Sequence, residues 1–173
     1  ESQKCGVKKI TLLSDTHGHM DAAIVKHCRW ADEIWHAGDI GTTAVTDQLK
    51  TLGPLRAVFG NIDGQQLRLE FPENQLFWCE DVKVVMTHIG GYPPKYNARV
   101  KALLAEEQPQ LYICGHSHIL KAMADKQRQL LHLNPGAAGK QGFHQMRTMM
   151  RFCIDGKKIQ NLEVLELGKR GAL

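Results

Sequence analysis

Five short apolar runs in this chain each stop at a polar residue that can bind a metal ion. The runs end at Asp15-Thr16-His17, Gly38-Asp39, Gly60-Asn61, His88 and Gly115-His116-Ser117-His118. Apolar runs of this length are typical of buried strands. Neighbouring strands that end in this way deliver their polar side chains to one edge of a sheet, where open α/β folds place ligands. The set comprises two carboxylates, one amide and four imidazoles. This number of ligands is larger than one metal ion ordinarily binds in a protein. The pattern therefore predicts a site for two metal ions.

The first third of the chain alternates between predicted strands and helices. The segments are strands at 9–14, 33–36 and 55–59 and helices at 21–30 and 43–52. The second helix is expected to end at Gly53-Pro54, a standard stop signal. This alternation predicts a mostly parallel sheet.

The rest of the chain contains closely spaced strand candidates. They lie at 65–69, 75–79, 82–87, 111–114, 146–154 and 158–165, with one helix predicted at 95–107. Glu80-Asp81 and Asp155-Gly156 have the residue types of hairpin turns. The sequence predicts an α/β fold, a two-sheet β-sandwich flanked by helices in the order α/β/β/α. Without an internal repeat or a linker, 173 residues predict a single domain over 1–173 with its core at about 8–165.

Charge and hydropathy narrow the class of partner. The net charge of +4 comes from scattered Lys and Arg, which favours a solvated surface and makes nucleic acid an unexpected partner except as substrate. No run approaches 18 apolar residues and no signal-peptide core is present, so we expect no membrane association. Five Cys without a CxxC pair argue against a disulfide framework and favour a reducing cytoplasm. Because residue 1 is Glu rather than Met, the natural start of the chain is left open.

Two of the polar clusters repeat a ligand at positions i and i+2. In extended backbone, Asp15 and His17 would face the same side of the chain, as would His116 and His118. Each motif taken alone is also typical of a turn, because Asp and Asn bond their own backbone. The ordered series after predicted strands favours metal binding over that alternative.

The series Asp-x-His, Gly-Asp, Gly-Asn-x-Asp, His and Gly-His-x-His resembles the calcineurin-like metallophosphoesterase superfamily. The opening Ser14-Asp15-Thr16-His17-Gly18 and the run Asn134-Pro135-Gly136 resemble its small bacterial and archaeal phosphodiesterase branch. The resemblance spans roughly residues 8–165.

The resemblance implies a ligand set and a reaction. Its first metal would be bound by Asp15, His17 and His118, its second by Asn61, His88 and His116, and Asp39 would bridge the two. Nitrogen and oxygen ligands without thiolate suit two divalent ions, Mn first, with Fe, Zn or Ni as alternatives. The implied reaction is phosphodiester hydrolysis by in-line attack of a metal-bridging hydroxide, with Asp39, Asn61 and His88 as catalytic residues.

One position departs from the pattern of many superfamily members. They carry Gly-Asn-His-Asp or Gly-Asn-His-Glu, whose His is thought to protonate the leaving oxygen, whereas this chain has Ile62 at that position. We therefore expect a preference for aryl phosphodiesters, whose leaving groups need little protonation. His19 is the nearest substitute acid, and an exposed loop residue is its alternative interpretation.

Several residues near the motifs have open roles. His36 is expected to be buried and hydrogen-bonded, and Asp63 to orient ligands rather than bind metal. His132 and His144 are candidates for the mouth of the site, and Tyr92 and Tyr96 for a substrate pocket or for packing.

Other functions are compatible with the same fold. A protein-interaction scaffold is one, because the fold also resembles a sorting-complex subunit that works through its surfaces. A phosphomonoesterase or a nuclease on the same metal core is another. A homo-oligomer is possible, because small members of this branch often assemble.

Overall fold

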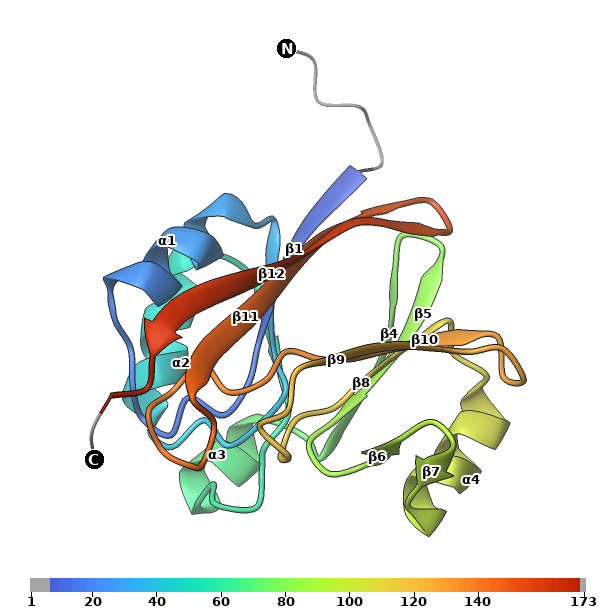
Figure 1. Cartoon of the computed structure of the whole chain (residues 1–173), viewed down its shortest axis with the longest axis horizontal. Coiled ribbons are helices and arrows are strands. Elements are labelled where there is room, and N and C mark those ends of the chain that lie inside the picture. The colour runs from blue at the N-terminus through green and yellow to red at the C-terminus, as the bar shows by residue number, and fades with distance from the viewer. Residues whose placement is uncertain (1–6, 172–173) are drawn as a thin grey trace.

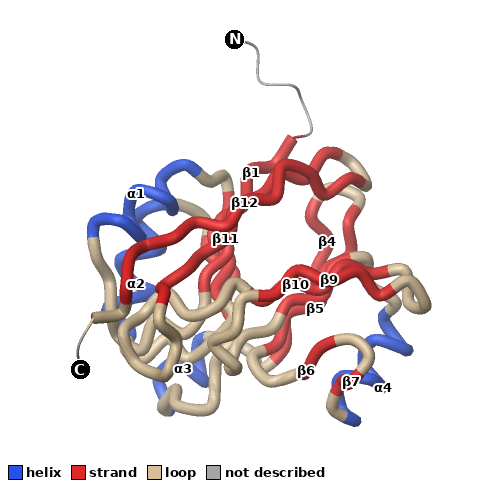
Figure 2. The backbone as a smooth tube through the Cα atoms, in the orientation of Figure 1, coloured by secondary structure: helices blue, strands red, loops and turns tan. Residues whose placement is uncertain are grey.

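The structure, a computed structural model, describes residues 7–171 and is built on two five-stranded sheets (Figure 1; Figure 2). The first sheet has the order β12-β11-β1-β2-β3 and the second the order β4-β5-β8-β10-β9. The strands of the first sheet are β1 (Val7–Leu13), β2 (Glu33–His36), β3 (Leu55–Ala57), β11 (Met146–Asp155) and β12 (Lys158–Lys169). Those of the second are β4 (Asn74–Cys79), β5 (Val82–Thr87), β8 (Leu111–Ile113), β9 (Lys121–Asp125) and β10 (Leu130–Asn134). A two-stranded hairpin consists of β6 (Gly91–Tyr92) and β7 (Lys95–Tyr96).

The main core lies between the two sheets. It joins Leu12 and Trp35 of the first sheet to Phe77, Val84 and Ile113 of the second. The Trp35 ring makes an edge contact with Phe77, at 5.0 Å between ring centroids. Two apolar sheet faces that close on each other define a β-sandwich.

Helices cover the outer faces of both sheets. The helices are α1 (Ala22–Trp30), α2 (Thr43–Leu52), α3 (Gln65–Glu70) and α4 (Ala98–Glu107). Ile24 of α1 and Leu49 of α2 pack with Ile34 on the first sheet. Val100 of α4 packs with Val85 on the second sheet. The layer order α/β/β/α is thus confirmed. Most residues of strands β1 and β5 are buried because both faces of these strands are covered, although each strand also contains Lys and Thr.

The predicted connections are right in most places. The Glu80-Asp81 turn joins β4 to β5 in antiparallel register, and Asp155-Gly156 joins β11 to β12. Strands β1, β2 and β3 are parallel as expected. The long strand β11 pairs antiparallel with β1, so the first sheet is mixed.

One predicted segment has the wrong type, and another begins at the wrong residue. Residues 65–69 form helix α3 rather than a strand, because Gln, Leu, Arg and Glu favour helix. The alternation of Leu67 and Leu69 resembles the two-residue period of a strand, which explains the wrong prediction. Of those two leucines, Leu67 is buried and Leu69 is exposed. The helix predicted at 95–107 begins at Ala98, because Asn97 caps it by accepting a hydrogen bond from the Val100 N–H.

Cys28, Cys79, Cys114 and Cys153 are free thiols, and Cys5 lies outside the described residues. Between residues 7 and 171, no helix has the length and apolarity required to cross a membrane.

Candidate metal centre

The polar strand endings of the two sheets meet at one edge of the sandwich. Asp15, Asp39 and Asn61 follow the parallel strands β1, β2 and β3. His88 and His116 follow β5 and β8, which are parallel in the second sheet. Parallel strands of one sheet end at the same edge, and the packing of the two sheets places the two edges in contact, as the distances between His88 and Asp15 and between His116 and Asn61 show.

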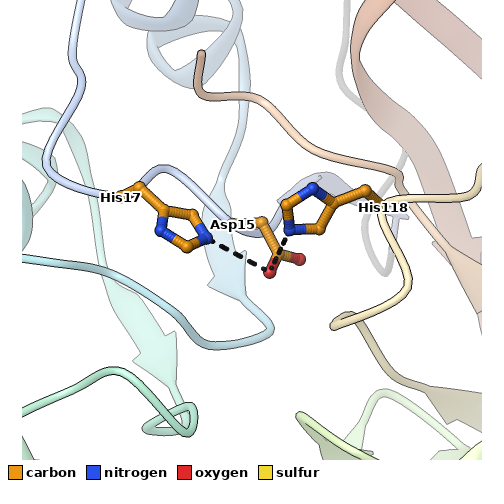
Figure 3. A group of neighbouring side chains, drawn as sticks. All are labelled: Asp15, His17 and His118. Atoms are coloured by element: carbon orange, nitrogen blue, oxygen red, sulfur yellow. Dashed lines mark ion pairs between the residues drawn. The ribbon is translucent and has the colours of Figure 1, made fainter. Parts of the chain in front are cut away.

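One group of ligand-type atoms consists of Asp15, His17 and His118 (Figure 3). The imidazoles of His17 and His118 approach the Asp15 carboxylate from its two sides. Oδ1 of Asp15 lies 3.2 Å from Nε2 of His118 and 3.9 Å from Nε2 of His17. Asp15 is fully buried, whereas His17 and His118 are partly exposed.

A second group consists of Asp39, His88 and His116. Oδ2 of Asp39 lies 3.2 Å from Nε2 of His88, and both side chains are buried. Asn61 belongs to the same group, because its Oδ1 lies 3.0 Å from Nδ1 of His116.

Asp39 and His88 join the two groups into one cluster. Oδ2 of Asp39 also lies 3.6 Å from Nε2 of His17, and Nε2 of His88 lies 3.8 Å from Oδ1 of Asp15. The structure thus brings together the seven side chains that the sequence predicted as ligands, with Asp39 between the two groups.

Buried atoms in this cluster lack hydrogen-bond partners. They are Oδ1 of Asp15, Nε2 of His17 and Nε2 of His88. A buried polar atom without a partner costs free energy, and such atoms are rare in folded proteins. Cations between the groups would satisfy all three, and the nitrogen and oxygen donors suit divalent ions such as Mn, Fe, Zn or Ni. The residues present therefore fit a metal site.

Hydrogen bonds from the surroundings orient the ligand side chains. Nδ1 of His88 donates to the carbonyl oxygen of Ala37 at 2.8 Å, which leaves the Nε2 lone pair free to bind a cation. Oδ2 of Asp15 accepts from the hydroxyl of Ser14 at 2.7 Å and from the backbone N–H of His116 at 3.2 Å. Partners of this kind fix the orientation of metal ligands and tune their affinity.

The Asp63 carboxylate binds the backbone of two ligand loops and not the side chain of a ligand. It accepts hydrogen bonds from the backbone N–H groups of Ile40 (3.1 Å), Gly41 (2.9 Å) and Gly60 (2.7 Å). These residues flank Asp39 and Asn61, so one buried carboxylate sets the separation of two ligand loops. This arrangement fits the orienting role expected from the sequence.

The ligand backbone is left-handed at several positions. The φ angles are 54° at Asp15, 46° at His17, 52° at Asp39, 71° at His116 and 61° at His118. The extended backbone expected for the two i, i+2 pairs is therefore wrong. Non-glycine residues in this region cost about 1 kcal/mol or more each, and such strain concentrates at functional sites.

Two glycines allow close approach within the cluster. A Cβ at Gly60 would lie 2.1 Å from Oδ1 of Asp39, and one at Gly115 would lie 2.2 Å from Oγ of Ser14. Neither glycine has a positive φ, so backbone conformation does not require glycine at these positions. The close contacts that a Cβ would make do require it.

Comparison with known proteins assigns the family. The sequence model of the calcineurin-like phosphoesterase superfamily domain matches residues 9–157. The chain belongs to this superfamily. A probable metallophosphoesterase of Methanothermobacter thermautotrophicus is 28% identical over 166 residues, which cover 92% of each chain. A second probable metallophosphoesterase, from Methanocaldococcus jannaschii, is 30% identical over 138 residues, covering 76% of this chain and 69% of that protein.

Solved structures share the fold of this phosphoesterase domain. A predicted phosphoesterase of Streptococcus pneumoniae superposes with a TM-score of 0.69 at 23% identity, over 92% of this chain and 90% of that one. Vps29 of Entamoeba histolytica, solved in complex with Zn²⁺, superposes with a TM-score of 0.70 at 16% identity, over 94% and 99% of the two chains.

The remaining histidines of the phosphoesterase domain have distinct positions. His36 is buried and hydrogen-bonded as predicted, accepting from the Gly38 N–H at 3.1 Å and donating to the Thr16 hydroxyl at 3.0 Å. Burial lowers the pKa of His36 to about 4 although nearby carboxylates oppose the shift, so the ring stays neutral at pH 7. His144 lies at the site, its ring centroid 5.1 Å from that of His118.

Other candidates are engaged elsewhere. His132 does not reach the mouth of the site, because it is buried and stacked on Tyr112 at 4.8 Å. Nε2 of His19 lies 3.0 Å from Oδ2 of Asp21, which also binds Arg147. Tyr96 packs within the fold and donates to Asp125, whereas Tyr92 is exposed beneath the ammonium group of Lys121.

Sequence reasoning missed two residues that hold the ligand loops. Asn134 donates from Nδ2 to the carbonyl oxygen of Gly115 and to the hydroxyl of Ser117, both at 3.1 Å. The Asn134-Pro135-Gly136 run marks this residue in the sequence, but the run alone does not indicate that Asn134 holds the ligand loops. Arg68 donates to the carbonyl oxygens of Asp63 and Asn61. Because the sequence predicts a strand at 65–69, it indicates no role for Arg68 at the ligand loops.

Proposed function

We propose that this protein is a metal-dependent phosphodiesterase with a dinuclear site. The observation that carries the proposal is the cluster of seven nitrogen- and oxygen-bearing side chains, which contains three buried atoms without a hydrogen-bond partner. The family match supports phosphoester hydrolysis in general. The diester specificity, the number of ions and a preference for manganese are our proposals.

In this proposal each residue has a defined role. Asp15, His17 and His118 would hold one ion, and Asn61, His88 and His116 would hold the other. Asp39, which lies between the two groups, would contribute to both. Divalent cations at such a site supply a water nucleophile at neutral pH and stabilise charge on phosphoryl oxygens.

The chain assists this chemistry by keeping its ligands charged and oriented. Burial of Asp39 favours its neutral acid, but His88, the Ile62 N–H and His17 outweigh that effect and lower the pKa of this carboxyl. The Ile62 N–H donates to Oδ1 of Asp39 at 3.1 Å, so Oδ2 faces the histidines. Asp39 is therefore a carboxylate across the physiological pH range.

The site favours substrates with good leaving groups. Ile62 is 46% exposed beside Asn61 and has no proton to transfer. Beside the histidine pair lies a cavity of about 450 Å³ lined by His116, His118, Ile119, Phe143 and His144. The exposed Ile119 and Phe143 give this cavity an apolar wall that suits an aryl group. We therefore propose aryl phosphodiesters as the preferred class.

Metal analysis combined with a substrate panel tests the proposal. Purified protein loaded with manganese should cleave phosphodiesters faster than phosphomonoesters, and excess chelator should abolish the activity. The Asp39→Asn variant should lose most bound metal and about 10²-fold or more in kcat, because it removes the shared carboxylate. Asp47→Asn, an exposed change on α2, is the matched control and should change neither.

Three outcomes would change the assignment. Full activity of Asp39→Asn, or of protein in excess chelator, would overturn the dinuclear mechanism. Faster cleavage of monoesters or nucleic acid would replace the diesterase with the corresponding hydrolase. Tight metal binding without hydrolysis would favour a scaffold, the alternative suggested by the fold shared with Vps29. A cytoplasmic location and a homo-oligomer stay predictions.

A further inference from the structure

A second cavity, of about 210 Å³, adjoins the other side chains of the cluster. Asn61 and His88 line it together with Phe59, Arg68, Glu73 and Arg99. It therefore opens beside the residues proposed to hold the second ion, and it differs from the apolar cavity in containing two guanidinium groups.

The Arg99 guanidinium is held in a fixed orientation. Its Nη1 donates to Oδ1 of Asn74 at 2.8 Å, and its Nη2 donates to the hydroxyl of Thr87 and to the carbonyl oxygen of Ile89, both at 3.0 Å. Thr87 and Ile89 flank His88, so the group is tied to the same loop as this ligand. A guanidinium has five N–H donors, and these three bonds leave donors for a bound anion.

Arg68 provides a second oriented guanidinium. It lies over the Phe59 ring at 4.5 Å, and its Nε donates to the carbonyl oxygen of Asp63 at 2.6 Å. Its Nη2 donates hydrogen bonds to the carbonyl oxygens of Gly60 (3.5 Å) and Asn61 (3.3 Å). Within residues 7–171 these bonds occupy Nε and Nη2, which leaves the two donors of Nη1 for a ligand.

The charge balance of the cavity is positive. Glu73 is the opposing group, with its Oε1 3.8 Å from Nε of Arg99, but its side chain is 59% exposed. An exposed ion pair at this distance is weak. Both arginines are also exposed, the Arg99 side chain by 41%, but two guanidiniums against one carboxylate leave a net positive charge that favours an anionic ligand. Oriented guanidiniums bind phosphate by paired hydrogen bonds.

We propose that this cavity binds a second phosphate group of the substrate, carried on the arm of the diester that does not leave. The inference rests on the proposed function and adds a substrate class to it. The substrate is an asymmetric diester whose leaving arm is apolar and whose retained arm ends in a phosphate a few bonds from the scissile phosphorus. Arg99 and Arg68 are then specificity-determining residues.

A matched pair of substrates isolates this contribution. Ethyl para-nitrophenyl phosphate and phosphoethyl para-nitrophenyl phosphate differ by one terminal phosphate. Hydrolysis of either adds water to phosphorus, breaks the bond to the aryl oxygen and releases para-nitrophenolate, which is measured by absorbance. The quantity compared is the ratio of kcat/KM for the two substrates, which cancels any general loss of activity in a variant.

The wild-type protein should favour the phosphoethyl ester by about tenfold, since charge-assisted hydrogen bonds at a partly exposed site contribute at that level. Arg99→Gln should bring the ratio close to one, and Arg99→Lys, which keeps the charge but loses the fork, should retain part of it. Arg29→Gln, at an exposed position on α1, is the matched control and should keep the wild-type ratio. Equal use of both esters by the wild type, or a preference that persists in Arg99→Gln, would overturn the inference while leaving the diesterase intact.

Binding provides a readout that does not depend on catalysis. In calorimetric titrations of the manganese-loaded protein, ethylene glycol bisphosphate should bind more tightly than ethyl phosphate, and Arg99→Gln should remove most of the difference. If neither ester is hydrolysed, the proposed function fails and this titration still decides the cavity. Equal binding of the two ligands would then overturn the inference.

Discussion

Ile62 stands at the position where a proton donor would help an alkoxide leave. Its side chain is exposed beside Asn61, so a longer polar side chain can be placed there without disturbing the core. We expect Ile62→His to raise kcat by about tenfold or more for dialkyl phosphodiesters, whose leaving group is an alkoxide, because general-acid help matters for poor leaving groups. Aryl leaving groups should gain little. Parallel rate measurements on both classes check this.

The apolar substitution Ile62→Val serves as the control for Ile62→His and should leave both substrate classes unchanged. An equal gain for alkyl and aryl leaving groups would contradict the role assigned to this position, as would comparable cleavage of both classes by the wild-type protein.

Gly60 tests whether crowding, rather than chain flexibility, determines the residue type. A Cβ there would lie 2.1 Å from Oδ1 and 2.3 Å from the backbone nitrogen of Asp39. Gly60→Ala should therefore displace the Asp39 loop, lower metal affinity and destabilise the fold by about 1–3 kcal/mol. Gly64→Ala is a close control, because a Cβ at Gly64 meets no atom within 4 Å. Metal titration measures the affinity, and urea unfolding measures the stability. Equal metal affinity and equal stability of the two variants would contradict the argument.

Helix α1 depends on a single charged cap. Asp21 accepts from the Ile24 N–H at 3.0 Å and from Nη2 of Arg147 at 2.7 Å, which joins the helix to β11. Burial favours the neutral acid, but the Ile24 N–H, His19 and Arg147 outweigh it and lower the pKa of Asp21 to about 2. A carboxyl whose pKa is lowered by folding stabilises the folded state above its unfolded pKa of about 3.9, and the contribution disappears as the pH falls toward 2.

The Asp21→Asn variant isolates that charge, because Asn keeps the cap. We expect it to be less stable than the wild type by about 1 kcal/mol at pH 7, with the difference shrinking between pH 4 and pH 2. Urea unfolding at a series of pH values measures both. Asp47→Asn on α2 should show no such trend, and a difference for Asp21→Asn that is constant with pH would contradict the linkage.

The elements that carry ligands were predictable because their signals are local. Strands β2 and β5 and helix α2 have the predicted bounds, since each is a single apolar or periodic run with a clear stop. The α3 segment was not predictable in this way, because Leu67 and Leu69 alternate like a strand while their neighbours favour helix. The helix places Leu67 in the core and leaves Leu69 exposed.

The ligand list was predictable, but the backbone geometry that presents it was not. Residue type and order identify Asp15 and His17, whereas the left-handed φ at both depends on contacts made by the surrounding loops. Backbone bonds from Asp15 to Gly38 and from His17 to Asp39 hold that conformation. Such contacts join segments that are distant in sequence, and no local pattern reports them.

At the scale of the whole molecule, the cluster connects the two sheets. Asp15, Asp39 and Asn61 follow strands of the first sheet, and His88 and His118 follow strands of the second. Without cations, the carboxylates and unpartnered nitrogens at this junction oppose its closure. Metal binding should therefore stabilise the entire sandwich rather than one loop.

A ligand that binds only the folded state at 100 times its Kd adds about 2.7 kcal/mol, which raises Tm by roughly 5–10 °C for a domain of this size. We expect Mn²⁺ to raise Tm by this amount and chelator to reverse it, as measured by differential scanning calorimetry. His118→Ala and His88→Ala each remove a ligand contributed by the second sheet, so each should lose most of the shift. Arg29→Gln should keep it. A metal-dependent shift that survives in both histidine variants would mean that the ions bind elsewhere, and the junction would then have no part in holding the sheets together.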